Sequence, residues 1–274
     1  VFGDWSSDVC SSDLNYRTLG RTGLRVSSLG FGAMHLPMTG QGPAARVDDE
    51  RAVPIMRHAF EAGVNFIDSA VFYCNSDSQR AVGEALKGRR DRIVVSTKNS
   101  YKGADERQWW KNLEDSLRML QTDHIDVYNI HGNSWKVWEE FGSPHISKWM
   151  MQARDQGMIR HFGCSSHDSD ANVRKLLETG FFESIILQYN MLNRTHEQTL
   201  AMAHERGIGV VIMGPLAGGK LALPNEVLAQ AAPGVEKNSG ELALRFVLAN
   251  PNVSVAMSGM ESTEIIDRNA AVAS

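Results

Sequence analysis

The chain repeats one pattern along most of its length: a short apolar, β-branched segment is followed by a segment whose apolar residues recur at helical spacing. The predicted strands are residues 29–33, 65–68, 92–97, 124–130, 159–165, 184–188, 209–213 and 253–258. The predicted helices are residues 49–62, 76–87, 106–120, 146–156, 171–179, 197–206, 239–249 and 263–273. Because each helix returns the chain to the same end of the sheet, this alternation predicts an α/β fold with parallel strands.

The number of these units favours a closed barrel over an open sheet. About eight βα units follow one another without a break in composition, as in a (β/α)8 TIM barrel of about 250 residues, and the chain has 274. A doubly wound open sheet is the alternative, but it usually carries GxGxxG after its first strand, where this chain has GFGAM at residues 30–34. Before that strand, RTG at residues 21–23 separates two extended segments of residues 16–27. This arrangement predicts an N-terminal β-hairpin that closes the barrel floor.

The N-terminal segment differs from the rest of the chain. Residues 1–14, VFGDWSSDVCSSDL, begin with Val rather than Met and show neither a strand nor a helix period. Because GDWSSDVCSSDL is similar to a sequencing-library adapter read in frame, we expect residues 1–14 to be a non-native, disordered tail. A native disordered tail is the alternative. Residues 15–274 are then expected to form one barrel domain, truncated at its C-terminus within the eighth helix.

Composition argues against several classes of protein. The formal net charge is −4, which provides no attraction for nucleic acid, and no run of ~18 apolar residues is present to span a membrane. Cys10, Cys74 and Cys164 are too few and too scattered for a disulfide framework or a metal site. We therefore expect a metal-free cytoplasmic protein, most simply a monomer.

Polar side chains stand at the ends of successive predicted strands. The strands end, in chain order, at Asp68, Lys98, His131, Ser165 and Gln188, and Tyr73 follows Asp68 on the next loop. Each residue alone has a structural explanation, such as a helix cap, a solvated charge or a core histidine. In a (β/α)8 barrel, however, the C-terminal ends of all strands meet at the active site. Their shared position on one rim predicts that these residues act together.

The residue types suit the reduction of a carbonyl group, which needs a hydride from a cofactor and a proton donor beside the oxygen. The phenol of Tyr73 has an unperturbed pKa near ~10, and a nearby Lys98 ammonium lowers that pKa, while Asp68 keeps Lys98 charged and positioned. His131 is expected to donate a hydrogen bond to the carbonyl oxygen, from a tautomer that the sequence leaves open. A lyase that uses Lys98 as a Schiff-base nucleophile is a competing hypothesis.

Five segments together resemble the aldo-keto reductase superfamily over residues 15–274. They are YRTLGRTGL at 16–24, LGFG at 29–32, GVNFIDSA at 63–70 followed by Tyr73, STK at 96–98, and IDVYNIH at 125–131. The resemblance implies an NAD(P)H-dependent oxidoreductase acting on a small-molecule aldehyde or ketone. It also implies that Asp68, Tyr73, Lys98 and His131 are catalytic, with Tyr73 as proton donor. A nicotinamide-binding sensor or regulatory subunit with little or no catalysis is the alternative.

The resemblance also implies a set of cofactor-binding residues. Ser165 and Gln188 correspond to contacts of the nicotinamide carboxamide, Ser166 stands where Asn is usual, and Met213 stands where many members stack an aromatic ring. The pyrophosphate loop corresponds to Pro215, Leu216, Gly218 and Lys220. The region of the adenosine corresponds to Ser258, Gly259, Met260, Glu264, Arg268 and Asn269, with Ser262 as the predicted N-cap of the last helix.

The choice between the two nicotinamide cofactors depends on the adenosine end of this site. Many members hold the 2′-phosphate of NADP(H) with an Arg or Lys, whereas this chain has Glu261, which repels a phosphate. Arg268 offers a compensating positive charge. We expect NADP(H), with NAD(H) as the alternative.

Two further expectations concern the periphery of the site. Residues 163–167, Met213 and the glycine pair at 218–219 resemble members that carry a C-terminal iron–sulfur module, whose cysteine cluster this sequence lacks. Trp135 and Trp138 follow His131 and are candidates for a wall of the substrate pocket, with ordinary packing as the alternative. Trp109 is expected in the core.

Overall fold

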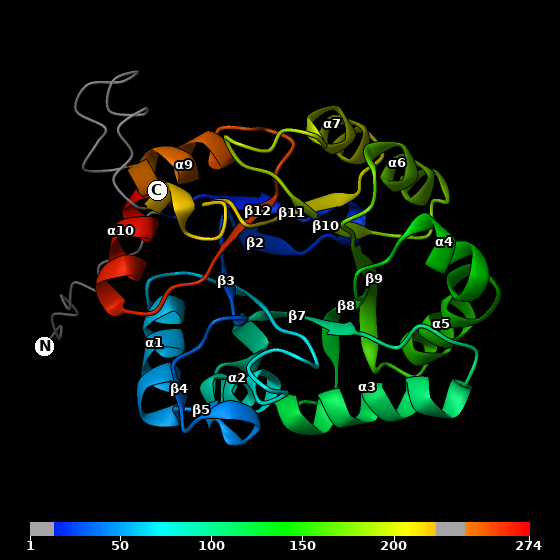
Figure 1. Ribbon diagram of the computed structural model, residues 1–274, viewed down its shortest axis with the longest axis horizontal. Helices are drawn as coiled ribbons and strands as arrows, with labels where there is room; N and C mark the ends of the chain where they lie inside the picture. Colours follow the sequence, from blue (N-terminus) through cyan, green and yellow to red (C-terminus); the bar gives the residue numbers. More distant parts are fainter. Residues whose placement is uncertain (1–13, 223–238) are drawn as a thin grey trace, which may run out of the picture.

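The computed structural model, which describes residues 14–222 and 239–274, has a closed barrel of parallel strands at its centre (Figure 1). The strands follow one another around the barrel as β3 (Leu29–Gly32), β6 (Phe66–Asp68), β7 (Val94–Asn99), β8 (Ile125–Ile130), β9 (Ile159–Ser165), β10 (Ser184–Gln188), β11 (Gly209–Met213) and β12 (Val255–Ser258). Pairing of β12 with β3 closes the ring. The predicted (β/α)8 barrel is thereby confirmed, and the open sheet is excluded.

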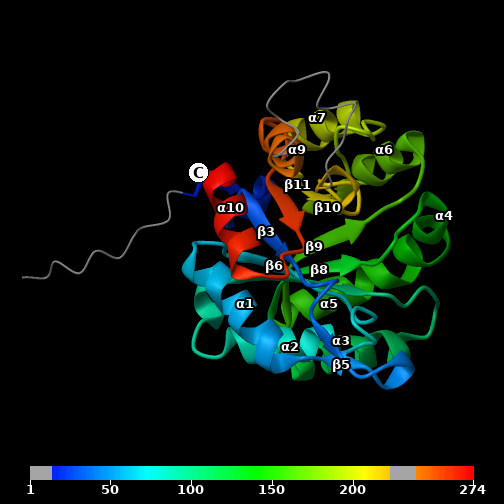
Figure 2. The same cartoon turned by 60° about the vertical axis from the view of Figure 1, so that its left-hand side comes forward.

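Helices surround the barrel on its outside (Figure 2). They are α1 (Asp49–Glu61), α2 (Ser78–Leu86), α3 (Glu106–Leu120), α5 (Ser147–Asp155), α6 (Asp170–Glu178), α7 (Glu197–Glu205), α9 (Ser239–Leu248) and α10 (Thr263–Ala273). Some of these helices begin after a side-chain cap: Asp105 accepts the backbone N–H groups of Arg107 and Gln108, and the predicted cap Ser262 accepts that of Ile265. Each cap satisfies donors that the first helical turn leaves unpaired.

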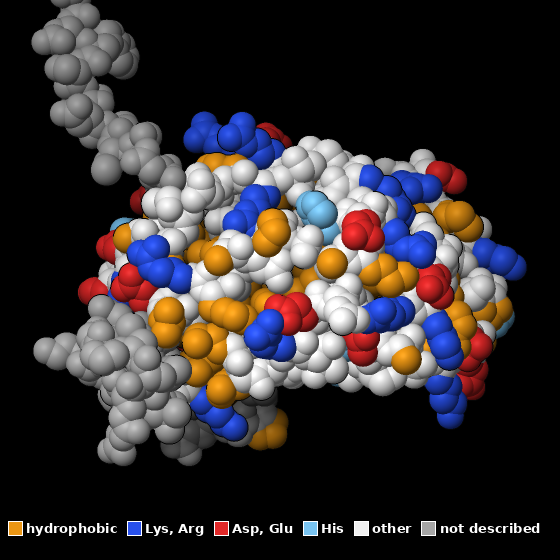
Figure 3. Space-filling model, turned by 90° about the horizontal axis from the view of Figure 1, so that it is seen from above, with side chains coloured by type: hydrophobic (Ala, Val, Ile, Leu, Met, Phe, Trp, Pro, Cys, Tyr) orange, Lys and Arg blue, Asp and Glu red, His pale blue; other side chains and the backbone are white. Residues whose placement is uncertain are grey.

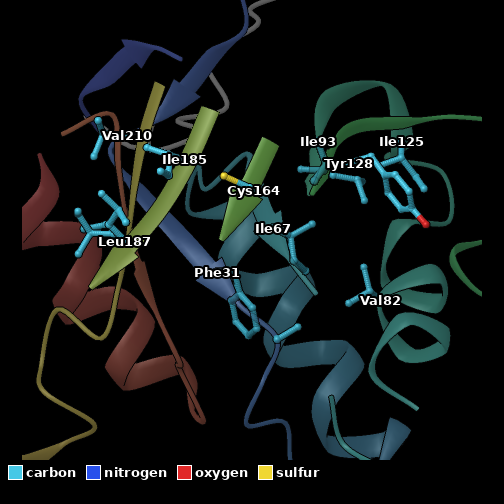
Figure 4. Packing of buried hydrophobic residues seen from close by; sticks show 14 of the residues in the cluster. Phe31, Ile67, Val82, Ile93, Ile125, Tyr128, Cys164, Ile185, Leu187 and Val210 are labelled. Carbon is cyan, nitrogen blue, oxygen red and sulfur yellow. The ribbon is translucent and has the colours of Figure 1, made fainter. Parts of the chain in front are cut away.

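The alternation of side chains along each strand divides the interior into two layers. Outward-facing residues such as Phe31, Ile67 and Cys164 pack between the barrel and the helices (Figure 4). Inward-facing residues form a second apolar cluster inside the barrel, which includes Phe66 and Val127. Because side chains two residues apart share a face of a strand, residues Asp68 and His131 point into the barrel above this cluster.

The hairpin before the first barrel strand closes the floor, as predicted. Strand β1 (Tyr16–Thr18) pairs antiparallel with β2 (Arg25–Ser27), and Leu19 and Val26 insert fully buried side chains into the inner cluster. Gly20 is required at the turn because its φ is +51° and a Cβ there would lie 2.3 Å from the backbone N of Gly209. Among the described residues, apolar side chains therefore fill the floor of the barrel, opposite the mouth at which the strands end.

Two structured segments were not predicted from the sequence. The helix before β9 begins at Trp135 instead of residue 146, because α4 (Trp135–Val137) continues through a π-helix, Trp138–Ile146, into α5. Gly142 and Pro144 interrupt the helical pattern in the sequence, and the wide π turns accommodate the missing N–H of the proline. A ribbon of two short strands, β4 (Met38–Thr39) and β5 (Arg46–Val47), also follows β3.

Residues 1–13, nearly all of the predicted tail, lie outside the described residues, whereas Leu14 is buried in the core. On the face drawn in Figure 3, basic and acidic side chains are interspersed and form no continuous patch of one sign. None of the described helices combines the length and apolar character needed to cross a membrane.

Candidate active site

Three neighbouring strands bring Asp68, Lys98 and His131 to the mouth of the barrel. Asp68 is the last residue of β6, Lys98 lies near the end of β7, and His131 directly follows β8. The strands are held in register by the pairs Asp68↔Ser96 and Lys98↔Asn129 and by the bond from the His131 backbone N to the Asn99 oxygen. These side chains therefore lie on one rim of the barrel, as predicted from the strand ends.

Asp68 and Lys98 form a buried ion pair whose remaining hydrogen-bonding groups are satisfied. Both residues are 2% exposed, and Lys98 Nζ donates to Asp68 Oδ2 and, at 2.8 Å, to the backbone oxygen of Ser69. The other carboxylate oxygen of Asp68 accepts the Ser96 hydroxyl at 2.8 Å, and that hydroxyl oxygen accepts Asn129 Nδ2 at 3.0 Å. A buried charge is tolerated only when it is paired and hydrogen-bonded in this manner, so Lys98 is fixed as an ammonium.

Tyr73 lies beside this ammonium, on the loop that follows β6. Lys98 Nζ is 4.6 Å from the centroid of the Tyr73 ring, and the ring meets that of His131 edge to face with centroids 5.9 Å apart. Burial raises the pKa of Tyr73, the charge and hydrogen bonding of Lys98 lower it, and Asp68 raises it, with a net increase. Lys98 thus lowers the pKa of Tyr73 in the expected direction, but burial, which the sequence did not indicate, outweighs its effect. Tyr73 is a protonated phenol at neutral pH.

The loop carrying Tyr73 has an unusual backbone. Cys74, Asn75 and Ser76 have φ values of 52°, 54° and 66°, and each such left-handed residue costs about 1–2 kcal/mol. Asn75 Nδ2 offsets part of this cost by donating to the backbone oxygens of Gly42 and Ala45 in the connection between β4 and β5. The unpredicted ribbon thus holds the loop that positions Tyr73.

His131 is half-buried and surrounded by positive charge. Burial lowers the pKa of His131 to about 4, with further lowering by Lys98, Lys102 and His167. The ring is therefore neutral at pH 7 and carries a single N–H. Its Nδ1 lies 2.9 Å from the hydroxyl of Ser100. Among the described residues no hydrogen bond of Nε2 is found, so this nitrogen is available to a ligand.

The residues predicted to hold the nicotinamide lie on the next three strands of the rim. Ser165 ends β9 and accepts the Gly132 backbone N–H at 2.8 Å, which leaves its hydroxyl hydrogen for a ligand. Gln188 and Met213 end β10 and β11 as a register pair, and both are partly exposed. Ser166 differs, since its hydroxyl donates to the Asn133 oxygen at 2.7 Å and accepts the Asp168 N–H. The structure thus gives Ser166 a role in holding the loop after β8, which the sequence did not indicate.

The glycine-containing loop after β11 presents backbone to solvent. Ala217, Gly218 and Gly219 have consecutive φ values of 51°, 67° and 88°, and Gly218 and Lys220 are exposed, whereas Pro215 is buried and Leu216 partly buried. Accessible backbone in a tight turn is the kind of site that accepts phosphate oxygens. These residues fit the predicted pyrophosphate loop.

At the start of α10 the predicted adenosine residues divide into two groups. Gly259, Glu264 and Arg268 are exposed, as is Glu261. Asn269 is 9% exposed and donates to the Ser258 hydroxyl at 3.3 Å, and Met260 is 1% exposed within the core. The side chain of Met260 packs in the core, so its predicted contact with the cofactor stays a prediction that only its backbone could meet without rearrangement. Within residues 14–222 and 239–274, Arg268 forms no ion pair.

Several residues that position the site were not predicted from the sequence. Ser69, Ser96, Ser100 and Asn129 bond directly to the predicted catalytic side chains or to their partners. The sequence did contain a signal for Ser96 and Asn129, because each lies two residues before a rim residue and therefore shares its inward face.

The two tryptophans after His131 lie among other side chains. Trp138 packs on Phe181 and Phe182 in the outer layer, and Lys175 lies over the ring of Trp135. Trp138 is therefore a packing residue, whereas the place of the partly exposed Trp135 in a pocket wall stays a prediction; Trp109 is buried as expected.

The described residues of this site include no cluster suited to a metal. In the part of the chain that the structure describes, no three His, Cys, Asp or Glu side chains gather closely enough to hold a metal ion. The chemistry of the described rim residues is that of a proton donor, a cation and a hydrogen-bond donor.

Comparison with known proteins agrees with this geometry. Residues 28–274 match the family model described as the aldo/keto reductase family. The L-galactose dehydrogenase of Arabidopsis thaliana is 30% identical, with 94% of this chain and 88% of that protein covered. The holo form of the aldo-keto reductase AKR11C1 from Bacillus halodurans has a TM-score of 0.81 and 30% identity, covering 94% and 90% of the two chains. An aldo/keto reductase from Klebsiella pneumoniae in complex with NADP and acetate has a TM-score of 0.77 and 25% identity, covering 93% and 88%.

Proposed function

The chain belongs to the aldo/keto reductase family, and from this premise we propose that it reduces an aldehyde or ketone with NADPH, using Tyr73 as the proton donor. One observation carries the proposal: a protonated phenol, a fixed ammonium and a neutral imidazole meet at the open mouth of a sealed barrel. Oxidation of NADPH upon addition of small aldehydes tests it. The absence of NADPH oxidation with every aldehyde and ketone tried would contradict it.

The residues of the rim fit a nicotinamide dinucleotide. Ser165 and Gln188 provide polar groups for a carboxamide, Met213 provides a soft apolar surface for a ring, and the loop at residues 214–220 provides backbone for phosphates. When bound, the reduced nicotinamide supplies the hydride that attacks the carbonyl carbon. Side chains of this chain orient the carbonyl group and supply the proton.

Tyr73 and His131 handle the carbonyl oxygen. A neutral imidazole N–H of His131 donates a hydrogen bond that orients the oxygen, and the phenol of Tyr73 transfers its proton to that oxygen as negative charge develops. The phenolate that remains is stabilised by the adjacent Lys98 ammonium, whose position is set by Asp68. Solvent then returns a proton to Tyr73, and the alcohol is released.

The state of Lys98 disfavours the competing lyase. A Schiff-base nucleophile must be an uncharged amine, whereas Lys98 Nζ donates to a buried carboxylate and to the Ser69 oxygen. Both contacts stabilise the ammonium. Borohydride is therefore expected to trap no adduct with a carbonyl compound in the absence of NADPH.

We propose NADP(H) as the cofactor, with NAD(H) as the alternative. The exposed Arg268 and Lys220 provide positive charge for phosphate groups, and the Klebsiella relative was solved with NADP. Glu261 opposes this choice because it places a negative charge at the start of α10. The balance between these charges is open to a direct test.

Replacing Glu261 with Lys is expected to lower the Kd for NADPH by up to about 5-fold, since one exposed charge pair contributes up to about 1 kcal/mol. The Kd for NADH, which lacks the 2′-phosphate, is expected to stay the same. Titration of the cofactors by protein fluorescence measures both values. Glu205→Lys on α7 is the control with an equal change in net charge. An equal effect of Glu261→Lys on both cofactors would show that residue 261 does not face the 2′-phosphate.

A further inference from the structure

The hydroxyl of Ser100 is the hydrogen-bonding group that the structure places on the ring of His131. Ser100 Oγ lies 2.9 Å from Nδ1, and both residues are partly buried. The two residues follow adjacent strands, β7 and β8, whose ends are joined by the bond from the His131 N–H to the Asn99 oxygen. This contact is therefore built into the end of the parallel ladder.

A neutral imidazole has one N–H, and the proposed reaction needs that hydrogen on the nitrogen facing the substrate. The carbonyl oxygen is an acceptor, so a bare ring nitrogen would give no hydrogen bond and would repel it. Burial, with Lys98 and Lys102 nearby, keeps the ring unprotonated at neutral pH. Which of the two nitrogens carries the hydrogen is then decided by their partners.

The arrangement of partners favours hydrogen on Nε2. A serine hydroxyl can either donate or accept, and for the Ser100 hydroxyl the described residues provide no hydrogen-bond acceptor other than Nδ1. If Nδ1 carried the hydrogen, the hydroxyl hydrogen would have no protein acceptor and Nε2 would present a lone pair to the site. If Ser100 donates to Nδ1, both groups are satisfied and Nε2–H is presented to a ligand.

We propose that Ser100 is a positioning residue, which donates its hydroxyl hydrogen to Nδ1 of His131 and thereby holds the ring in the Nε2–H tautomer. The inference rests on the proposed reductase function for its consequence, but the tautomer itself exists without any substrate. Ser100 acts through His131 and does not touch the reacting atoms.

The tautomer is measured by ¹⁵N NMR of histidine-labelled protein at neutral pH, because protonated and unprotonated ring nitrogens have well-separated shifts. His131→Gln assigns the signals. We expect the wild type to show hydrogen on Nε2 and none on Nδ1, and Ser100→Ala to show a mixture of tautomers. Ser100→Thr, which keeps the hydroxyl, is expected to restore the wild-type pattern.

Turnover provides the second readout. Ser100→Ala is expected to lower kcat by about 5- to 10-fold, the effect of one neutral hydrogen bond, with little change in the Kd for NADPH, and Ser100→Thr is expected to recover most of it. Ser147→Ala, which removes a hydroxyl bonded to the Ser143 oxygen on the outer helix, is the matched control.

The NMR and turnover results together test the role of Ser100 and the reductase function separately. Hydrogen on Nδ1 in the wild type, or an unchanged tautomer and kcat in Ser100→Ala, would overturn the role of Ser100 while an active enzyme leaves the reductase intact. An inactive wild type whose tautomer depends on Ser100 would support the positioning role and reject the reductase.

Discussion

Replacing Tyr73 with Phe is expected to lower kcat for carbonyl reduction by about 10²- to 10⁴-fold, the contribution of a positioned general acid. The substitution removes the only hydroxyl of this side chain but keeps the ring that packs against the Lys98 ammonium and the His131 edge. Binding of NADPH is expected to remain, because the proposed cofactor contacts lie on other strands. Steady-state turnover and a fluorescence titration of the same variant measure the two effects separately.

Tyr16→Phe is the matched control for this substitution. Tyr16 lies in the floor hairpin and donates to the Gly63 oxygen at 2.7 Å, at the closed end of the barrel. Its loss is expected to leave kcat unchanged. A Tyr73→Phe variant that keeps wild-type turnover would show that the proton comes from another donor, while the fold and the cofactor proposal would stand.

Replacing Lys98 with Met is expected to destabilise the protein by about 3–5 kcal/mol, since it leaves the carboxylate of Asp68 buried without its partner. Asp68 is 2% exposed, so water does not compensate for the lost ammonium. The same variant is expected to lose reductase activity, because the phenolate formed at Tyr73 is no longer stabilised. Urea denaturation and turnover assays measure the two losses.

The double variant with Asp68→Asn and Lys98→Met distinguishes the stability effect from the catalytic one. It removes both charges, and the Asn side chain retains hydrogen-bonding groups for Ser96, so most of the lost free energy of unfolding is expected to return. Activity is expected to stay low. Recovery of activity together with stability would mean that Lys98 serves the fold alone.

The fold was predictable because its signal is local and repeated. Each barrel strand is a short apolar run, such as IVVS at residues 93–96, and each is followed by a segment with helical spacing. Strand and helix ends moved by no more than two residues except before β9. There Gly142 and Pro144 interrupt the helical pattern of the sequence, so the sequence predicts no helix at these residues. In the structure, the helix that starts after the Ser134 cap continues through a π-helix to α5.

The site was predictable only in its outline. Rim residues follow from the ends of the strands, but the details depend on contacts between segments far apart in sequence. Nothing local indicates that Cys74 to Ser76 are left-handed, because the ribbon at residues 38–47 imposes that turn. In the same way, Ser166 is engaged by the loop after β8, and burial decides the direction of the pKa shift of Tyr73.

The most direct test of the reductase proposal is transfer of the hydride itself. Purified protein is incubated with a small aldehyde and NADPH that carries deuterium at its transferable position, and the alcohol is analysed by mass spectrometry. The proposal predicts one deuterium on the former carbonyl carbon of each alcohol formed, and formation by Tyr73→Phe that is about 10²- to 10⁴-fold slower. Binding of NADPH without any deuterated alcohol from a panel of aldehydes and ketones would contradict the proposal and favour a nicotinamide sensor.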